Sequence, residues 1–212
     1  MFQRFVHVLA TDPFSIPIHV WTGIFAFWLK LRRNVTIQGK LRLNGQPIVD
    51  IRKGSHLYIG AGVVLNSRNK GYHLNMHSPV KLFADRPGAC IRIGNHTRIH
   101  GSCIHAFHSV EIGSNCLIAA NCQIFDGNGH DLSFSDVGNR VNTEGASNPV
   151  KIEDNVWIGA DSMIFPGVTI GAGSVIAARS VVVNDIPPMV LAGGHPATIW
   201  KRYAPADGAP IS

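Results

Sequence analysis

A six-residue period in aliphatic residues is the feature of this sequence that most restricts its fold. The period runs without a break through Ile152, Ile158, Ile164, Ile170, Ile176 and Val182, and it recurs upstream at Ile93 and Ile99 and at Ile112, Ile118 and Ile124. On strands an even spacing directs all these side chains to one face, whereas on an α-helix they would scatter over several sides. Gly, Asn, Asp and Ser fill the intervals, so each repeat predicts a short strand and a turn. Stacked coils of a solenoid must then bury the aliphatic side chains together.

A second, smaller set of residues follows the same period. The fourth position after each aliphatic residue is also an even step, so its side chain is predicted to point inward, where a narrow interior admits only modest volume. These positions hold Thr97, Cys103, Cys116, Cys122, Val156, Ser162, Val168, Ser174 and Ser180. Three of the four cysteines thereby become packing residues. A reduced, cytoplasmic protein without a disulfide framework is predicted.

The composition excludes several classes of protein. With 45% hydrophobic and 15% charged residues in 212 positions, the chain is neither disordered nor fibrous, and its length suits one domain. Lys and Arg form no run with interleaved aromatic residues, so nucleic acid is not a predicted partner. The formal charge of +6 leaves two interpretations open, general solubility or the binding of a phosphorylated ligand.

The N-terminal segment is rich in apolar and aromatic residues between Phe14 and Leu31, but Pro17 and Lys30 are among the residues that interrupt it. It lacks the continuous apolar stretch of a membrane span, and no small-residue cleavage site follows it. Pro17 predicts a helix start, with an end near residues 32–34. Two interpretations remain for residues 14–33: a helix packed on the domain or on a neighbouring subunit, or a peripheral contact with the inner face of a membrane.

Residues 148–202, which begin NPVKIEDNVWIGADSMIFPGVTIGAGSVIAARS, resemble the C-terminal half of galactoside, maltose and polysaccharide O-acetyltransferases of the hexapeptide-repeat family. The resemblance implies an all-β solenoid, a left-handed parallel β-helix, that forms a homotrimer with active sites between neighbouring prisms. The predicted organisation is an N-terminal helical segment at 1–34, a β-helix acyltransferase domain at 35–202 and a tail at 203–212.

The period breaks once, because Ile152 follows Ile124 after 28 positions, which is not a multiple of six. Residues 125–149 are polar and glycine-rich, which predicts a protruding loop. In the resembling enzymes a loop at this place carries the catalytic histidine, in a pattern close to Ile-x-Asp-x-Asp-x-His. The corresponding residues are Asp126, Asn128 and His130, with Asn128 where an Asp is usual. His130 would take the proton from the attacking hydroxyl group, and Asp126 or Asn128 would orient its ring.

The resemblance also implies acetyl-coenzyme A as co-substrate. Its pantetheine arm would lie along the coils and touch the backbone at Ala160 and Ala178, which are 18 positions, or one coil, apart. Lys201 would meet the nucleotide phosphates. Arg202 is adjacent to Lys201. Two interpretations remain for Trp157, a wall of this groove or a cover for an outer face, and Arg179, where the family usually has Gly, is predicted to supply the charge lost next to Val183. Val183 departs from the Thr that is usual in the family.

Four histidines crowd together upstream at positions 96, 100, 105 and 108. The resemblance implies that His100 and His105 line the acceptor pocket, because the preceding coil faces the sugar in related enzymes; the alternative is that they are surface residues. A γ-carbonic-anhydrase-like metal enzyme is a rival hypothesis, because that family holds a metal with three histidines on the same fold. The favoured function needs no metal: acetyl-coenzyme A-dependent O-acetylation of a sugar hydroxyl, in a bacterial surface polysaccharide or its precursor. Two further hypotheses stay open, N-acetylation of an amino sugar on the same fold and a scaffold without catalytic activity.

Overall fold

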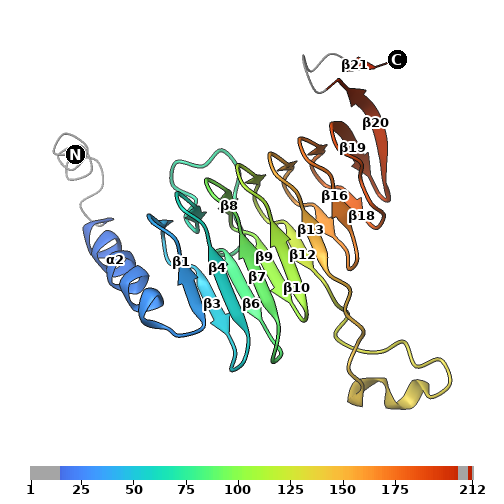
Figure 1. Cartoon of the computed structure of the whole chain (residues 1–212), viewed down its shortest axis with the longest axis horizontal. Coiled ribbons are helices and arrows are strands. Elements are labelled where there is room, and N and C mark those ends of the chain that lie inside the picture. The colour runs from blue at the N-terminus through green and yellow to red at the C-terminus, as the bar shows by residue number, and fades with distance from the viewer. Residues whose placement is uncertain (1–14, 205–209, 212) are drawn as a thin grey trace.

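The computed structural model describes residues 15–204 and 210–211, and it shows a three-sided solenoid of short parallel strands (Figure 1). The first side contains β1 (Val35–Ile37), β4 (His56–Ile59), β7 (Cys90–Ile93), β10 (Ser109–Ile112), β13 (Val150–Ile152) and β16 (Thr169–Ile170). The second contains β2 (Arg42–Asn44), β5 (Val64–Asn66), β8 (Arg98–His100), β11 (Leu117–Ile118), β14 (Trp157–Ile158), β17 (Val175–Ile176), β19 (Val190–Gly194), β20 (Ala197–Tyr203) and β21 (Pro210–Ile211). The third contains β3 (Ile48–Ile51), β6 (Lys81–Ala84), β9 (Cys103–Ala106), β12 (Gln123–Phe125), β15 (Met163–Ile164) and β18 (Val181–Val182). We call these sides sheets A, B and C.

The core consists of the periodic aliphatic residues, which the structure buries as the sequence predicts. Ile158, Ile164 and Ile170 are fully buried, and each pairs in register with the aliphatic residue of a neighbouring coil. One inward assignment is wrong. Cys103 is only half-buried, because the side that runs from Ile99 to Ile104 is one residue short and places Ser102 inward instead.

The small polar core residues contribute hydrogen bonds as well as volume. Ser102 donates to the carbonyl of Ala119 at 2.7 Å, and Ser174 donates to that of Pro187 at 2.7 Å. Ser180 donates to the carbonyl of Ala177 at 2.7 Å. Because turn carbonyls have no strand partner, buried hydroxyl groups at these corners satisfy backbone acceptors that would otherwise be costly to bury.

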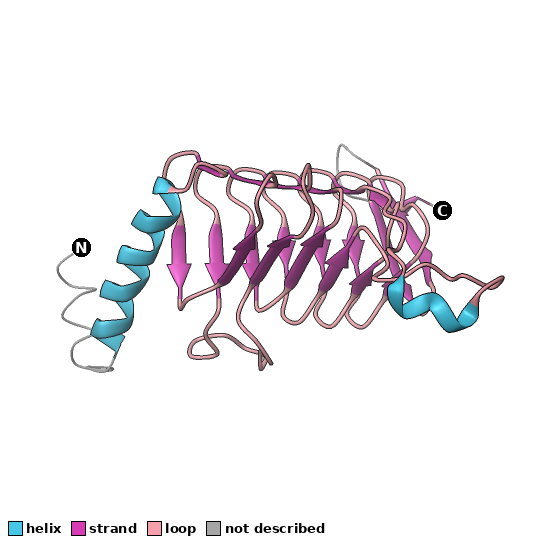
Figure 2. Ribbon diagram, turned by 90° about the horizontal axis from the view of Figure 1, so that it is seen from below, coloured by secondary structure: helices cyan, strands magenta, loops and turns pink. Residues whose placement is uncertain are grey.

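Helix α2 (Ser15–Leu31) lies against the N-terminal end of the solenoid (Figure 2), which confirms the predicted N-terminal helix. Thr22 and Leu29 are buried on the first coil. Just beyond the helix, the Arg32 guanidinium donates to the carbonyl of Ile51 at 2.7 Å. In the part of the chain that the structure describes, no helix combines the length and apolarity needed to cross a membrane.

Two loops leave the solenoid. The predicted one, between β12 and β13, protrudes and contains a 3-10 helix, η1 (Val137–Asn142) (Figure 1). The other, residues 67–80 between β5 and β6, was not predicted from the sequence. Asn69 holds it, because its side chain bonds both the N–H and the carbonyl of Met76. At the C-terminal end, β20 reverses the chain and pairs antiparallel with β19.

Candidate functional site

The loop that carries His130 leaves the solenoid through a short antiparallel neck. Gly127 and Ser147 form a β-bridge, the Asn128 N–H donates to the Ala146 carbonyl at 3.1 Å, and the Asn148 N–H donates to the Asp126 carbonyl at 2.7 Å. His130 lies just beyond this neck and its side chain is exposed. A paired neck holds the histidine at a defined place on the turn from sheet C to sheet A, although the loop around it is long.

Asp126 anchors the root of this neck. Its side chain is fully buried, and its two carboxylate oxygens accept hydrogen bonds from the N–H groups of Phe107 at 2.6 Å and His108 at 2.7 Å. Both oxygens therefore bind the turn of the preceding coil. Asn128 is exposed. The hypothesis that either residue orients the His130 ring stays a prediction.

Gly145 faces His130 across the neck. A Cβ atom built on Gly145 would overlap the carbonyl of Asn128 and lie 2.9 Å from the carbonyl oxygen of His130. Arg86 holds the same strand from outside, since its guanidinium donates to the Gly145 carbonyl at 3.3 Å and lies over the Phe107 ring, 4.4 Å from its centre. The neck thus requires glycine here for close backbone approach.

Gly145→Ala is expected to open the neck while the solenoid stays folded, because the added methyl group meets backbone atoms that cannot rotate away. Limited proteolysis should then cut within residues 127–147 at least about tenfold faster than in the wild-type protein, with an almost unchanged melting temperature. Gly138→Ala is the matched control, because a Cβ atom there meets nothing within 4 Å. Equal cleavage of both variants would show that the neck does not depend on this contact.

The second part of the site is a groove of about 520 Å³ on the outer face of sheet B. Trp157, Ala160, Ala178 and His100, four of the predicted site residues, line it together. Trp157 is 51% exposed, which favours its predicted role as a groove wall. Tyr72, from the unpredicted 67–80 loop, also lines the groove and stacks on the His100 ring at 4.4 Å between centres.

The backbone of the groove offers unpaired hydrogen-bond donors. Within residues 15–204, the N–H groups of Ala160 and Ala178 have no hydrogen-bond partner. Several equivalent N–H groups on the turns from sheet A to sheet B are capped by side chains, for example that of Ala61 by Asn95 at 2.8 Å and that of Ser114 by Asp154 at 2.6 Å. The two donors line the groove one coil apart, so a ligand lying along the groove could supply both missing acceptors.

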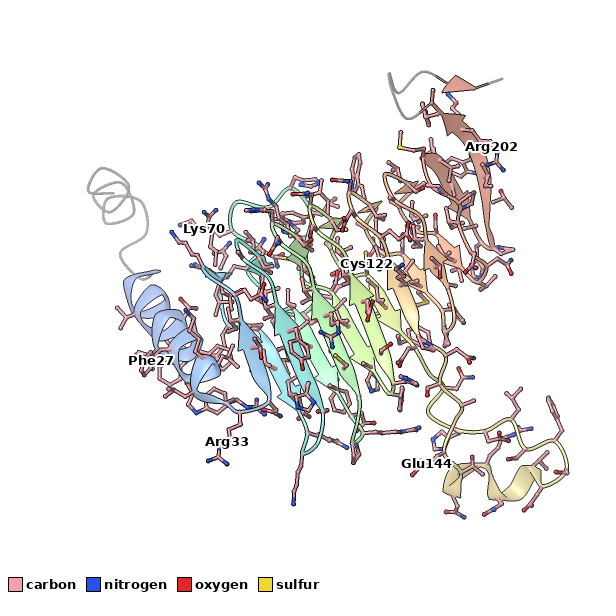
Figure 3. The ribbon with its side chains drawn as sticks, viewed as in Figure 1. Phe27, Arg33, Lys70, Cys122, Glu144 and Arg202 are labelled. Atoms are coloured by element: carbon pink, nitrogen blue, oxygen red, sulfur yellow. The ribbon has the colours of Figure 1, made fainter. Side chains whose placement is uncertain are left out.

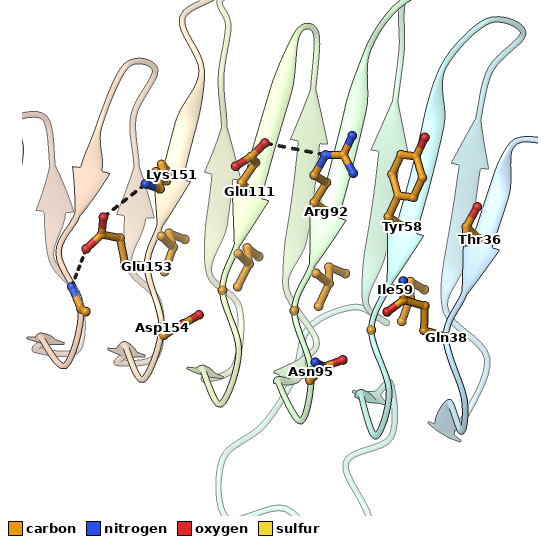
Figure 4. Close-up of a pocket in the computed structure, with 17 residues that line it drawn as sticks. Thr36, Gln38, Tyr58, Ile59, Arg92, Asn95, Glu111, Lys151, Glu153 and Asp154 are labelled. Carbon is orange, nitrogen blue, oxygen red and sulfur yellow. Dashed lines mark hydrogen bonds and ion pairs between the residues drawn. The ribbon is translucent and has the colours of Figure 1, made fainter.

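Sheet A carries a different concave surface, of about 480 Å³, whose charges are already paired (Figure 4). Arg92 lies 3.7 Å from Glu111, and Lys151 lies 3.3 Å from Glu153, which also accepts the Ala172 N–H. None of the predicted site residues lines this surface. The internal pairing makes it a weaker candidate for ligand binding than the groove on sheet B.

His100 is held in one tautomer by a ladder of side chains across sheet B. Asn44 donates to the Asn66 side-chain oxygen at 2.7 Å, so the Asn66 amide nitrogen, 3.1 Å from Nδ1 of His100, must donate to that ring nitrogen. Burial, aided by the charges of Arg98 and His73, lowers the His100 pKa to about 4. The ring is therefore neutral at pH 7, with Nε2–H as its donor.

His105, predicted to join His100, lies elsewhere. It belongs to β9 on sheet C, where its ring is flanked by Phe83 and Phe107 at centre distances of 4.4 Å and 4.2 Å. Its buried Nε2 is 3.8 Å from Asp85, too far for a hydrogen bond, and burial lowers its pKa. The crowded histidines thus spread around the coil, and among the described residues no three His, Cys, Asp or Glu side chains gather as metal ligands.

The remaining predicted ligand residues lie towards the C-terminal end. Lys201 on β20 pairs with Leu191, which pairs with Val175 of the groove, so Lys201 lies on the outer face of sheet B. Arg202 is the next residue on the strand and pairs with the buried Val190. Its Cβ atom is therefore on the opposite face of sheet B from that of Lys201. Arg179 and Val183 are exposed, but neither lines the groove within one chain.

The groove and the His130 loop both belong to one chain, but they do not meet within that chain. The groove occupies sheet B and its turn to sheet C, whereas the His130 loop begins after β12 of sheet C and ends at β13 of sheet A. The two parts therefore lie on different sides of the same solenoid.

Comparisons with known proteins agree with this architecture. Residues 149–184 match the family model "Bacterial transferase hexapeptide (six repeats)", and residues 90–125 match "Hexapeptide repeat of succinyl-transferase". Galactoside O-acetyltransferase of Escherichia coli is 46% identical over 100 residues, 47% of this chain and 47% of the relative. The chain spans about half the length of the curated relatives it matches.

Two solved structures resemble the chain over a larger part. A hexapeptide-repeat acetyltransferase from Vibrio cholerae, complexed with acetyl-coenzyme A, is 32% identical, covers 70% of each chain and superimposes with a TM-score of 0.52. Galactoside acetyltransferase in complex with coenzyme A is 33% identical, covers 65% of this chain and 69% of its own, and gives a TM-score of 0.52. The chain belongs to the hexapeptide-repeat acetyltransferase family, and its fold is the left-handed β-helix predicted from the sequence.

Proposed function

We propose that this protein transfers the acetyl group of acetyl-coenzyme A to a hydroxyl group of a saccharide. The observation that carries the proposal is the pair of unpaired N–H groups at Ala160 and Ala178, one coil apart along the groove. An extended arm with amide groups, such as pantetheine, has carbonyl acceptors for such donors. Two similar structures are complexes with acetyl-coenzyme A and with coenzyme A, which supports the same class of ligand.

The chemistry proposed for His130 is direct transfer. The acceptor oxygen bonds to the thioester carbonyl carbon, the carbon–sulfur bond breaks, and His130 takes the hydroxyl proton and passes it to the departing sulfur. Backbone N–H groups and the neutral Nε2–H of His100 are suitable donors for the developing oxyanion. Asp126 supports this step indirectly, by fixing the root of the His130 loop.

The proposed active unit is a homotrimer, in which the His130 loop of one chain reaches the groove of its neighbour. The support is the separation of the two parts within one chain, together with an exposed apolar tip on the loop, where Phe134 is 80% and Val141 is 75% exposed. Mixing an inactive His130→Ala protein with an inactive groove variant, Ala178→Glu, should restore part of the activity if subunits exchange. Failure of such mixtures, together with a monomeric mass, would contradict the shared site.

A thiol-release assay with acetyl-coenzyme A and a panel of glycans and amino sugars tests the function directly. Release that depends on a sugar hydroxyl supports O-acetylation, whereas release only with amino sugars supports N-acetylation. Transfer to a precursor of a surface polysaccharide in the cytoplasm is the setting we propose. The four free cysteines are compatible with a reducing compartment.

Lys201→Glu is expected to weaken coenzyme A binding at least about tenfold, because it reverses a charge at the end of the groove face where the nucleotide phosphates are proposed to lie. The loss should be smaller for dephospho-coenzyme A if Lys201 meets the ribose phosphate. Titration calorimetry at two salt concentrations measures both effects, and Lys151→Glu on sheet A is the matched control. An equal loss of affinity for the two ligands would show that Lys201 does not contact the ribose phosphate.

A further inference from the structure

We propose that the exposed face of α2 is a docking surface for an anionic lipid membrane, on which the protein rests with the N-terminal end of the solenoid. The proposal comes from two features that the structure brings together at this end, an apolar aromatic stripe and nearly all of the excess positive charge. It concerns binding to lipid and is independent of the acetyl-transfer proposal.

The α2 outer face is a continuous stripe of large apolar side chains. Their spacing follows helical periodicity, and each is about half or more exposed: Val20 (59%), Trp21 (56%), Ile24 (54%), Phe27 (65%), Trp28 (49%) and Leu31 (67%). Phe27 projects away from the solenoid, opposite to the side that packs on the first coil (Figure 3). A cluster of this kind on a described surface marks an interaction site.

The helix cannot turn this face inward. Its opposite side already buries Thr22 and Leu29, and Arg32 ties its C-terminal end to the carbonyl of Ile51. A helix fixed flat on the end of the solenoid presents its outer face along the solenoid axis. Trp28 in that face suits the headgroup region of a bilayer, where an apolar ring with a polar edge is favoured, whereas the Trp21 indole N–H donates to the side chain of Gln46.

The charge of the chain is concentrated around this face. Residues 15–53 contain seven lysines and arginines against one aspartate, whereas residues 54–212 contain eleven of each sign. Lys30, Arg33, Lys40 and Lys53 are exposed on the helix or on the turns of the first coil. The formal charge of +6 thus belongs to the end that carries the apolar stripe. Anionic headgroups complement this charge, and each basic residue near such a surface strengthens the binding.

The charge also argues against a second copy of the chain packed end to end on this face. A second copy packed end to end would bring two strongly positive surfaces together, which is unfavourable. The other exposed apolar cluster, at the tip of the 125–149 loop, has four acidic residues and one arginine in its sequence, so it lacks the same complementarity to lipid. The two clusters therefore fit different partners.

Flotation of the full chain with lipid vesicles tests the proposal. We expect binding to phosphatidylcholine vesicles that contain about one quarter phosphatidylglycerol, at least about tenfold weaker binding to pure phosphatidylcholine, and loss of binding at about 0.5 M salt. The double variant Phe27→Ser, Leu31→Ser should bind at least about tenfold more weakly. Phe134→Ser, which removes an even more exposed ring from the loop, should bind as the wild-type protein does.

A charge variant gives a second test that does not depend on the apolar substitutions. Arg33→Glu should weaken vesicle binding several-fold, whereas Arg202→Glu, at the far end of the solenoid, should not (Figure 3). The proposal would be overturned if neither the Phe27→Ser, Leu31→Ser variant nor the Arg33→Glu variant lost vesicle binding. Equal binding of the wild-type protein to neutral and anionic vesicles would also overturn it. A drop in the solution mass of the Phe27→Ser, Leu31→Ser variant would also overturn it, because the face would then be covered by a second copy.

Discussion

Replacement of His130 by alanine is expected to lower the rate of acetyl transfer about 10²- to 10⁴-fold, the usual contribution of a general acid–base group. The fold and coenzyme A binding should persist, because the side chain is exposed beyond the neck and none of the groove-lining residues belongs to its loop. His130→Asn should be nearly as slow, since an amide cannot accept the proton. Steady-state rates and a separate measurement of coenzyme A affinity distinguish the two effects.

The matched control is His77→Ala, which removes another exposed histidine from a different loop and should leave the rate within about twofold. Near-normal turnover of His130→Ala would show that His130 is not the general base. The break in the six-residue period after Ile124 would then be unexplained. Ping-pong kinetics or an acetylated side chain would contradict direct transfer, since both require a covalent intermediate on the enzyme.

The repeat could be predicted from the sequence because it depends only on whether the spacing between aliphatic residues is an even number. A strand alternates its two faces, so a spacing of six keeps Ile158, Ile164 and Ile170 inward whatever the turns between them do. The same rule failed at Cys103, where one side of a coil has five residues and the inward position passes to Ser102. Counting four positions on from Ile99 assumes a side of six residues, whereas the next inward aliphatic residue, Ile104, follows after only five.

The parts of the site that depend on contacts between coils could not be predicted. The break after Ile124 predicted the loop, but the amide partners of Asp126 belong to the preceding coil. Tyr72 closes the groove over His100 from a loop whose only signal in the sequence is a gap in the aliphatic period between Leu65 and Leu82. His100 and His105 are five positions apart, yet the turn between β8 and β9 sends them to different sheets.

Ile170→Asp is expected to unfold the C-terminal coils, because it places an unpaired carboxylate in an interior too narrow to hydrate it. Ile170 is fully buried between Ile152, its partner in β13, and Ile186, to which it is bridged in the next coil. Loss of the aliphatic side chain costs about 2–5 kcal/mol, and burial of a charge adds several more. The total is comparable with the whole free energy of unfolding of a typical domain, about 5–15 kcal/mol.

The consequence should spread beyond the substituted coil, since each coil of a solenoid is stabilised by its neighbours and the groove is built from several of them. Circular dichroism should show a large loss of stability, and coenzyme A binding should disappear with it. Met163→Asp makes the same kind of change on the outward face, where the side chain is 42% exposed, and should melt within a few degrees of the wild-type protein. If the two variants were equally stable, the position of Ile170 in the core would be wrong, and with it the inward assignment of every residue in the period.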